Sequence, residues 1–274
     1  MRSQYASKFV DAAGVRTHYI EAGKGEPVIL IHGGGAGAES YGNWNRVIPL
    51  LAPHFRVIAI DMVGFGQTAK PDGASFTYSQ SARNDQLIGV IEGLKLKRAS
   101  IVGNSMGGAT GIGVAVKRPD LVSKLILMGS AGLNVGISEA LKPIIHYDFT
   151  REGMVKLIRA LTTDTFKIDD TLVDERYQRS LDPEVRRAYH ATMAWVKEQG
   201  GLFYDEGFLG KVGVPTLIMN GKLDKVVPLG IALKFLDIIP RSWAYFIPDC
   251  GHWAQIEHPE DFAGATRTFL QAAH

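Results

Sequence analysis

The chain has 274 residues, of which 46% are hydrophobic and 21% are charged, as in an ordinary globular protein. It is longer than a typical single domain, but α/β folds often reach about 250 residues as one unit, so we expect one core domain that carries an insertion. The net charge is only +2 and no basic tract stands out, which argues against a nucleic-acid partner. The single cysteine, Cys250, excludes an intrachain disulfide and a metal site built on thiolates.

The sequence shows no segment for export or membrane insertion. Residues 1–9 mix charged and small side chains and lack the apolar stretch of a signal peptide. The longest uncharged run, residues 99–116, contains five glycines as well as Asn104, Ser105 and Thr110, so it is interpreted as a buried strand and helix and not as a membrane span. We therefore expect a cytoplasmic protein without a membrane partner.

The predicted elements alternate between strand and helix. Two short segments, residues 8–11 and 15–21, predict an opening β-hairpin. Apolar strands are then predicted at 27–31, 55–60, 100–102, 124–128, 214–219 and 243–247, and helices at 43–51, 78–93, 229–238 and 259–272. Apolar strands that alternate with helices are typical of a parallel sheet covered on both faces. The sequence thus predicts a doubly wound α/β sheet with reactive groups at the carboxyl ends of its strands.

The strand pattern stops between residues 134 and 208. Helices are predicted there at 138–145, 150–161 and 182–199, with charges interleaved among apolar side chains. We expect residues 1–133 and 209–274 to form the core domain, and residues 134–208 to form a helical cap that encloses a pocket and excludes water. The alternative is a small independent domain without contact to the site.

Ser105 is the candidate nucleophile. It lies in Gly103-Asn104-Ser105-Met106-Gly107, between a predicted strand and a predicted helix, which is the pattern of a nucleophile elbow. Such a turn is sharp and strained, and small neighbours let its strand and helix approach each other closely. The motif alone is weak evidence for a catalytic serine, because a chain with 31 glycines can contain it by chance. The surrounding residues decide whether Ser105 is the nucleophile.

Asp224 and His252 complete a candidate catalytic triad. Both follow later predicted strands, and the chain order Ser, Asp, His is that of α/β-hydrolases. A serine hydroxyl needs a base to accept its proton, which is the role of His252, and Asp224 would orient the imidazole. Taken singly, Asp224 could be an exposed turn residue, and His252 is one of eight histidines. Their joint order at strand ends favours the triad.

An oxyanion site is predicted beside the serine. The glycine run at 33–35 follows a buried strand and leaves backbone N–H groups free to approach an anion, although a flexible turn is the alternative. We expect the N–H groups of Met106 and Gly34 to stabilise the developing charge. His32 could compete for the role of base, but it precedes the elbow and is interpreted as a structural partner of the glycine run. Asp249 lies too close to His252 in sequence to come from a separate strand end, and Cys250 is interpreted as a packing residue.

These motifs resemble those of the meta-cleavage product hydrolases, which are C–C bond hydrolases of the α/β-hydrolase fold acting on 2-hydroxy-6-oxohexa-2,4-dienoates from bacterial aromatic degradation. The resemblance is carried by residues 32–38 with Asn43 downstream, by 103–108, and by 250–254 with Glu257 and His258. One departure is Ala36, where many relatives have proline. The resemblance implies a mostly parallel eight-stranded sheet with helices on both faces and an inserted helical cap. It also implies no cofactor or metal, a small-molecule dienoate substrate and a homo-oligomer.

The resemblance further implies a set of residues that binds the carboxylate and 2-oxo end of the substrate: Gly33, Gly35, Asn43, Asn104, Arg176 and Trp253. Arg176 suits this role because a guanidinium offers a fork of donors to a carboxylate. A solvated surface position for Arg176 is one alternative, and another is that the role belongs to a neighbouring arginine of the cap: Arg179, Arg186 or Arg187. Asn104 could instead bond its own turn, and Trp253 could be a packing aromatic.

The mechanism that the resemblance implies has two stages. The dienol is first ketonised at its far carbon, and then Ser105, or a water activated by His252, attacks the 6-oxo carbon. Cleavage releases a carboxylic acid and 2-hydroxypenta-2,4-dienoate. We hypothesise an acyl-enzyme, because the elbow presents Ser105 as a nucleophile, and leave a gem-diol as the alternative. A carboxylesterase and a ligand sensor of the same fold are the rival functions, whereas haloalkane dehalogenases carry an aspartate where this chain has Ser105.

Overall fold

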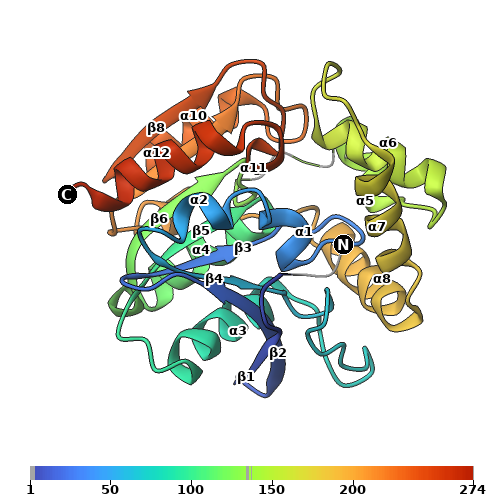
Figure 1. Ribbon diagram of the computed structural model, residues 1–274, viewed down its shortest axis with the longest axis horizontal. Coiled ribbons are helices and arrows are strands. Elements are labelled where there is room, and N and C mark those ends of the chain that lie inside the picture. Colours follow the sequence, from blue (N-terminus) through green and yellow to red (C-terminus); the bar gives the residue numbers. More distant parts are fainter. Residues whose placement is uncertain (1–3, 134–135, 137, 274) are drawn as a thin grey trace.

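The computed structural model describes residues 4–133, 136 and 138–273. Within them, eight strands form one sheet in the order β1-β2-β4-β3-β5-β6-β7-β8 (Figure 1). The first two strand pairs, β1 with β2 and β2 with β4, are antiparallel, and the other pairs are parallel. The mostly parallel eight-stranded sheet is therefore confirmed. The strands are β1 (Lys8–Ala12), β2 (Val15–Ala22), β3 (Pro27–Ile31), β4 (Arg56–Ile60), β5 (Ala99–Asn104), β6 (Val122–Met128), β7 (Thr216–Gly221) and β8 (Ser242–Ile247).

Helices cover both faces of the sheet, and alternate residues of the central strands pack against them. In β3, Ile29 and Ile31 join a cluster that includes residues of α3, α4 and α10, whereas Val28 and Leu30 join a cluster with residues of α1, α2 and α12. Because successive side chains of a strand point to opposite faces, an apolar run is the pattern that two covered faces require. The core helices are α1 (Ser40–Trp44), α2 (Ile48–Leu51), α3 (Gln80–Gly93), α4 (Met106–Lys117), α10 (Leu229–Ile238), α11 (Ala254–Glu257) and α12 (Pro259–Gln271), with a 3₁₀ turn at Pro119–Leu121.

The segment between β6 and β7 is helical, as predicted, and Figure 1 shows α5 to α8 grouped together on one side of the molecule. Its elements are η2 (Glu139–Leu141), α5 (Lys142–Ile145), α6 (Arg151–Leu161), α7 (Asp170–Ser180), α8 (Pro183–Glu198) and α9 (Glu206–Leu209). None of the helices in the described part of the chain has the length and hydropathy that a bilayer span requires.

Two predicted helices differ in the structure, and α7 and the four-residue helices α9 and α11 were not predicted. The helix predicted at 43–51 is two short helices, α1 and α2, and the one predicted at 138–145 is the 3₁₀ turn η2 followed by α5. The helix α7 escaped prediction because its buried stripe is Val173, Arg176 and Ser180, so two of the three inward positions are polar. The apolar period that identifies a helix is therefore absent from it.

Candidate active site

Ser105 occupies a strained turn between β5 and α4. Its backbone has φ 55° and ψ −117°, which is uncommon for a residue with a side chain. The turn closes tightly, because a Cβ added at Gly107 would lie 2.4 Å from the carbonyl oxygen of Ile31, and one at Gly103 would lie 2.4 Å from that of Gly107. The flanking glycines are thus required by close backbone approach, as expected of a nucleophile elbow.

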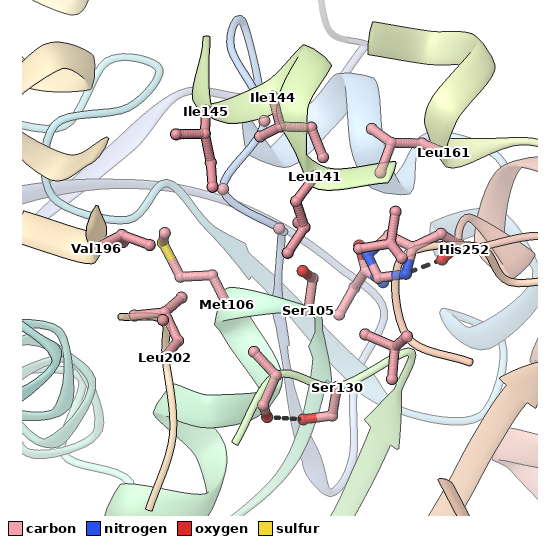
Figure 2. Close-up of a pocket in the computed structure, with 18 of the residues that line it drawn as sticks. Ser105, Met106, Ser130, Leu141, Ile144, Ile145, Leu161, Val196, Leu202 and His252 are labelled. Carbon is pink, nitrogen blue, oxygen red and sulfur yellow. Dashed lines mark hydrogen bonds between the residues drawn. The ribbon is translucent and has the colours of Figure 1, made fainter. Parts of the chain in front are cut away.

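Asp224 and His252 are buried and directly bonded. Asp224 follows β7 and His252 follows β8, and Nδ1 of His252 lies 2.7 Å from Oδ2 of Asp224. The other carboxylate oxygen accepts hydrogen bonds of 2.8 Å from the backbone N–H groups of Val226 and Val227. Since a carboxylate can only accept, Nδ1 of His252 donates, and its Nε2 is left as the basic nitrogen. Ser105 and His252 line the same cavity (Figure 2).

The glycine run lies against the elbow. A Cβ added at Gly33 would be 3.2 Å from Cβ of Ser105, and one at Gly34 would be 2.4 Å from Cε of Met106. The N–H of Met106 is at the first position of α4, where a helix offers no acceptor of its own. The positions predicted for the oxyanion donors are therefore adjacent to the serine.

His32 holds the glycine run in place. Its Nδ1 donates to the carbonyl oxygen of Gly33 at 2.7 Å, and its Nε2 accepts from the N–H of Met62 at 3.0 Å. Both ring nitrogens are thus used within the fold, and burial lowers the pKa of the imidazole below its usual value. This geometry supports the structural role over that of a competing base.

The other competitors are placed away from the chemistry. Asp249 is exposed, and its backbone adopts a φ of 50° in the turn after β8. Cys250 is fully buried, and burial raises the pKa of its thiol well above the ordinary value. A buried thiol that stays protonated packs as a small apolar side chain.

The cavity above Ser105 is mainly apolar. It has a volume of about 100 Å³, several times the roughly 10–15 Å³ that one water needs, so it has room for an extended ligand. Its polar lining is Ser105, His252, Asn104 and Ser130. Figure 2 shows Leu141, Ile144, Ile145 and Leu161 across the pocket from Ser105. Further apolar lining residues come from both parts of the chain: Leu133, Met193, Val196, Leu202, Phe203, Val226, Val227 and Ile231.

Arg176 is buried beside this cavity, next to Gly35 and Trp253 of its lining. Its Nη1 donates to Oδ1 of Asn43 at 3.2 Å, its Nη2 donates to the carbonyl oxygen of Ala36 at 3.0 Å, and its Cζ lies 4.7 Å from the centre of the Trp253 ring. A Cβ added at Gly35, which lines the cavity, would be 3.3 Å from Nη2. Arg176 is only 1% exposed, so the surface alternative is wrong. Burial, followed by repulsion from Arg179, lowers its pKa to about 9.

The neighbouring arginines have other partners. Nε of Arg179 donates to the carbonyl oxygen of Gly37, and its guanidinium pairs with Glu39. Arg186 stacks on the ring of Phe149. Arg187 is exposed and donates to the carbonyl oxygen of Lys70. Among the described arginines of the cap segment, Arg176 is thus the one that meets Asn43 and Trp253.

Asn104 is bonded mainly within the scaffold. Its Nδ2 donates to the carbonyl oxygen of Met128 at 3.0 Å and to that of His252 at 3.4 Å, and its Oδ1 accepts from Gln255. These bonds support the alternative that the side chain fixes the elbow and the histidine loop.

Sequence reasoning did not find the residues that shape the cavity. Ser130 could have been found, because it follows β6 directly and the carboxyl ends of strands meet at one edge. The apolar cap residues gave no signal that separates a pocket wall from a helix core. Residues 134, 135 and 137, at the start of the predicted cap segment, lie outside the described residues.

Comparison with known proteins agrees with this geometry. A family model described as the alpha/beta hydrolase fold matches residues 26–259, which is most of the chain. A protein of Metapseudomonas resinovorans, 2-hydroxy-6-oxo-6-(2'-aminophenyl)hexa-2,4-dienoic acid hydrolase, is 62% identical over 269 residues, covering 98% of this chain and 92% of the relative.

Two solved structures are similar over nearly the whole chain. A serine hydrolase involved in carbazole degradation superposes with a TM-score of 0.90 at 60% identity, covering 97% of this chain and 98% of the other. A mutant of the meta-cleavage product hydrolase from Pseudomonas fluorescens IP01, complexed with acetates, superposes with a TM-score of 0.90 at 35% identity, covering 96% and 97%. The chain is an α/β-hydrolase. Within that fold it belongs to the meta-cleavage product hydrolases.

Proposed function

We propose that this enzyme hydrolyses the C–C bond next to the 6-oxo group of 2-hydroxy-6-oxohexa-2,4-dienoates that carry an aryl group at C6. The observation that carries the proposal is the buried Arg176, which forms no ion pair with a carboxylate of the described residues. It lies beside Gly35 and Trp253, which line the same apolar cavity as Ser105 and His252. The relative at 62% identity acts, by its name, on a substrate with a 2-aminophenyl group. The apolar wall of the cavity can pack against such an aromatic ring.

The carboxylate end of the substrate binds beside Arg176. Nε of Arg176 and Nδ2 of Asn43 are buried and find no hydrogen-bond partner in the described part of the chain. Buried donors are normally paired, and a lone buried cation is costly. An anionic ligand therefore supplies the acceptor for these donors and the negative charge for the guanidinium. Trp253 stacks on the guanidinium, Gly33 and Gly35 give the ligand close access to the backbone, and Asn104 fixes the elbow.

The triad then acts at the other end of the dienoate. The substrate ketonises as its 2-hydroxyl proton is lost and C5 gains a proton, which makes the C5–C6 bond breakable. Ser105 Oγ attacks C6 while His252 Nε2 takes the hydroxyl proton and Asp224 stabilises the imidazolium. The N–H groups of Met106 and Gly34 hold the oxyanion.

Collapse of the tetrahedral intermediate breaks the C5–C6 bond. The electron pair of that bond delocalises from C5 to the 2-oxo oxygen, which gains the proton released by His252, and 2-hydroxypenta-2,4-dienoate leaves. Water activated by His252 then hydrolyses the acyl-serine to the carboxylic acid. Mass spectrometry of rapidly quenched single turnovers should show the acyl group on Ser105, and its persistent absence favours a gem-diol route instead.

The cap is assigned to residues 134–208, with residues 1–133 and 209–274 as the core domain. Its support is that residues of α5, α6 and α8 form the cavity wall opposite the core residue Ser105. We also assign the enzyme to the cytoplasm as a homo-oligomer without a nucleic-acid partner. Size-exclusion chromatography with light scattering measures the mass of the assembly, and a monomer at the concentration of the activity assays contradicts the homo-oligomer.

Changing Ser105 to alanine tests the function. The variant should lose turnover of a 6-aryl dienoate by about 10⁴-fold or more, measured as loss of the yellow dienolate colour, and should still bind it. The wild type should prefer the dienoate over a p-nitrophenyl ester by kcat/KM. A preference for the ester indicates a carboxylesterase, and full activity of Ser105→Ala overturns the nucleophile.

A further inference from the structure

A second buried aspartate–histidine pair lies outside the cavity. Asp61 directly follows β4, and His18 lies in β2, the neighbouring strand. Nδ1 of His18 is 2.8 Å from Oδ2 of Asp61, and the two side chains are 2% and 0% exposed. The Asp224–His252 pair has nearly the same values, 2.7 Å, 1% and 0%.

Backbone donors hold Asp61 as they hold Asp224. The N–H of Ser40 donates to Oδ1 of Asp61 at 2.6 Å, and that of Gln67 donates to Oδ2 at 2.8 Å. A carboxylate that accepts these bonds is kept ionised, and it directs the Nδ1–H of His18 toward itself. His18 is therefore fixed with its Nε2 as the basic nitrogen.

A serine completes this second pair. Oγ of Ser7 lies 2.7 Å from Nε2 of His18, and Ser7 is exposed. The side-chain amide of Gln67 donates to the Ser7 hydroxyl at 3.2 Å and also lies 3.4 Å from Nε2 of His18. Because Nδ1 donates to Asp61, Nε2 can accept the proton of the Ser7 hydroxyl, which is the arrangement that makes a serine nucleophilic.

We propose that Ser7 is a second activated serine, which reacts at the surface with small acylating or phosphorylating compounds that carry a good leaving group. With a phosphorofluoridate, Ser7 Oγ bonds to phosphorus, the P–F bond breaks, fluoride leaves, and His18 Nε2 receives the hydroxyl proton. The Gln67 amide is the donor available to the charged oxygen. Among the described residues, this is the one side-chain donor to the Ser7 hydroxyl, and it lies on an open surface. It supports stoichiometric modification and not rapid turnover, since efficient acyl transfer needs preorganised donors in a site that excludes water.

The test uses the full chain carrying Ser105→Ala, so that the active-site serine cannot react. The protein is treated with diisopropyl fluorophosphate, and the rate of adduct formation at each serine is followed by peptide mass spectrometry. Ser75 is the internal reference, because it is exposed, its hydroxyl donates to the carbonyl oxygen of Asp72, and no histidine of the described residues is hydrogen-bonded to it. Ser7 should be labelled about 100-fold faster than Ser75, as expected for assistance by a general base.

Two further variants show whether fast labelling of Ser7 results from activation by His18 or only from the exposure of Ser7. His18→Gln in the same background should lower the Ser7 rate to near that of Ser75, with circular dichroism reporting whether the fold is kept. Ser7→Ala in the otherwise wild-type chain should leave dienoate hydrolysis unchanged, so this proposal and the proposed function can fail separately. Equal labelling of Ser7 and Ser75 overturns the proposal, whether or not the His18 variant folds, and so does unchanged labelling in a folded His18→Gln protein.

Discussion

Gly129 lies next to the Asp224–His252 pair and has a backbone φ of 49°. A Cβ at this position would lie 2.8 Å from Nδ1 of His252, which is closer than such atoms approach, and 3.0 Å from Oδ2 of Asp224, which is a tight contact. Gly129→Ala should therefore separate the pair and lower kcat by about 100-fold, since an orienting carboxylate is worth up to about 10⁴-fold.

The matched control is Gly264→Ala. Gly264 lies in α12, and a Cβ there meets nothing within 4 Å, so the helix should gain about 0.5–1 kcal/mol of stability and keep its activity. Steady-state kinetics and thermal unfolding of both variants measure the contrast. A fully active Gly129→Ala enzyme is incompatible with the triad geometry.

Arg176 is expected to bind the substrate carboxylate. Its charge is buried and forms no ion pair with any of the residues that the structure describes, so an incoming carboxylate gains a strong charge-assisted bond. Arg176→Gln should raise KM for the dienoate by about 30–100-fold, equivalent to about 2–3 kcal/mol, with a smaller effect on kcat. Titration of the inactive Ser105→Ala protein with substrate checks the same loss as a dissociation constant.

Arg187→Gln is the control for this change, because Arg187 is exposed and its guanidinium donates to the carbonyl oxygen of Lys70, away from Asn43 and Trp253. It should leave KM within about twofold of wild type, since surface substitutions are usually near neutral. If Arg176→Gln behaves like Arg187→Gln, the carboxylate binds elsewhere.

At the residue scale, the sequence predicted that the three proposed triad residues meet at strand ends, but it could not predict the walls of the cavity. Ser105, Asp224 and His252 follow strands, and strand ends converge wherever a parallel sheet forms. Arg176 was chosen through resemblance, and its burial could not be predicted, because nothing in its own helix distinguishes an inward arginine from an outward one. The cavity wall depends on how separate helices pack, which local patterns do not encode.

At the level of elements, Glu257 ties the histidine loop to the end of α6. Its Oε1 accepts from the N–H of Gly251 at 2.9 Å, and its Oε2 accepts from both the N–H and the hydroxyl of Thr163 at 2.8 Å. The N–H of His252 also donates to the carbonyl oxygen of Leu161, the last residue of α6. The loop that carries the base is thus bound to the cap segment.

Removing this connection should lower both the stability of the protein and its activity. Glu257→Ala leaves the N–H groups of Gly251 and Thr163 without their acceptor, so the free energy of unfolding should fall by about 2–4 kcal/mol and kcat should fall about tenfold as His252 loses its fixed position. Glu260→Ala, at an exposed position of α12, is the control. Urea unfolding and steady-state kinetics distinguish them, and equal behaviour of the two variants argues against the connection.

The elements themselves differ in how well the sequence predicts them. The strands were predictable because β3, β4 and β6 are apolar on both faces. The short helices α1 and α2 were predicted as one helix, because the spacing of apolar residues does not show where one helix ends and the next begins. Tertiary contacts decide such breaks, and these contacts are not local.

For the whole molecule, the same burial that shapes the oxyanion loop makes stability depend on pH. His32 is fully buried, and burial holds the pKa of its imidazole below the ordinary value near 6.5. Between that lowered pKa and about 6.5, the unfolded chain binds a proton that the folded chain does not. The unfolded state is therefore favoured as the pH falls through this window, and the stabilising effect of neutral His32 is fully present above it.

Urea unfolding between pH 7.5 and pH 5 should show this loss. The free energy of unfolding should fall by up to about 1.4 kcal/mol for each pH unit below 6.5 on account of this one proton. His32→Gln removes the titrating group while keeping an oxygen that can accept from Met62 N–H and an amide that can donate to Gly33, so its profile should be shallower by about one proton. Identical slopes for the two proteins would mean that His32 is protonated in the folded enzyme, and the glycine loop would then need a different hydrogen-bond pattern from the one its neutral ring provides.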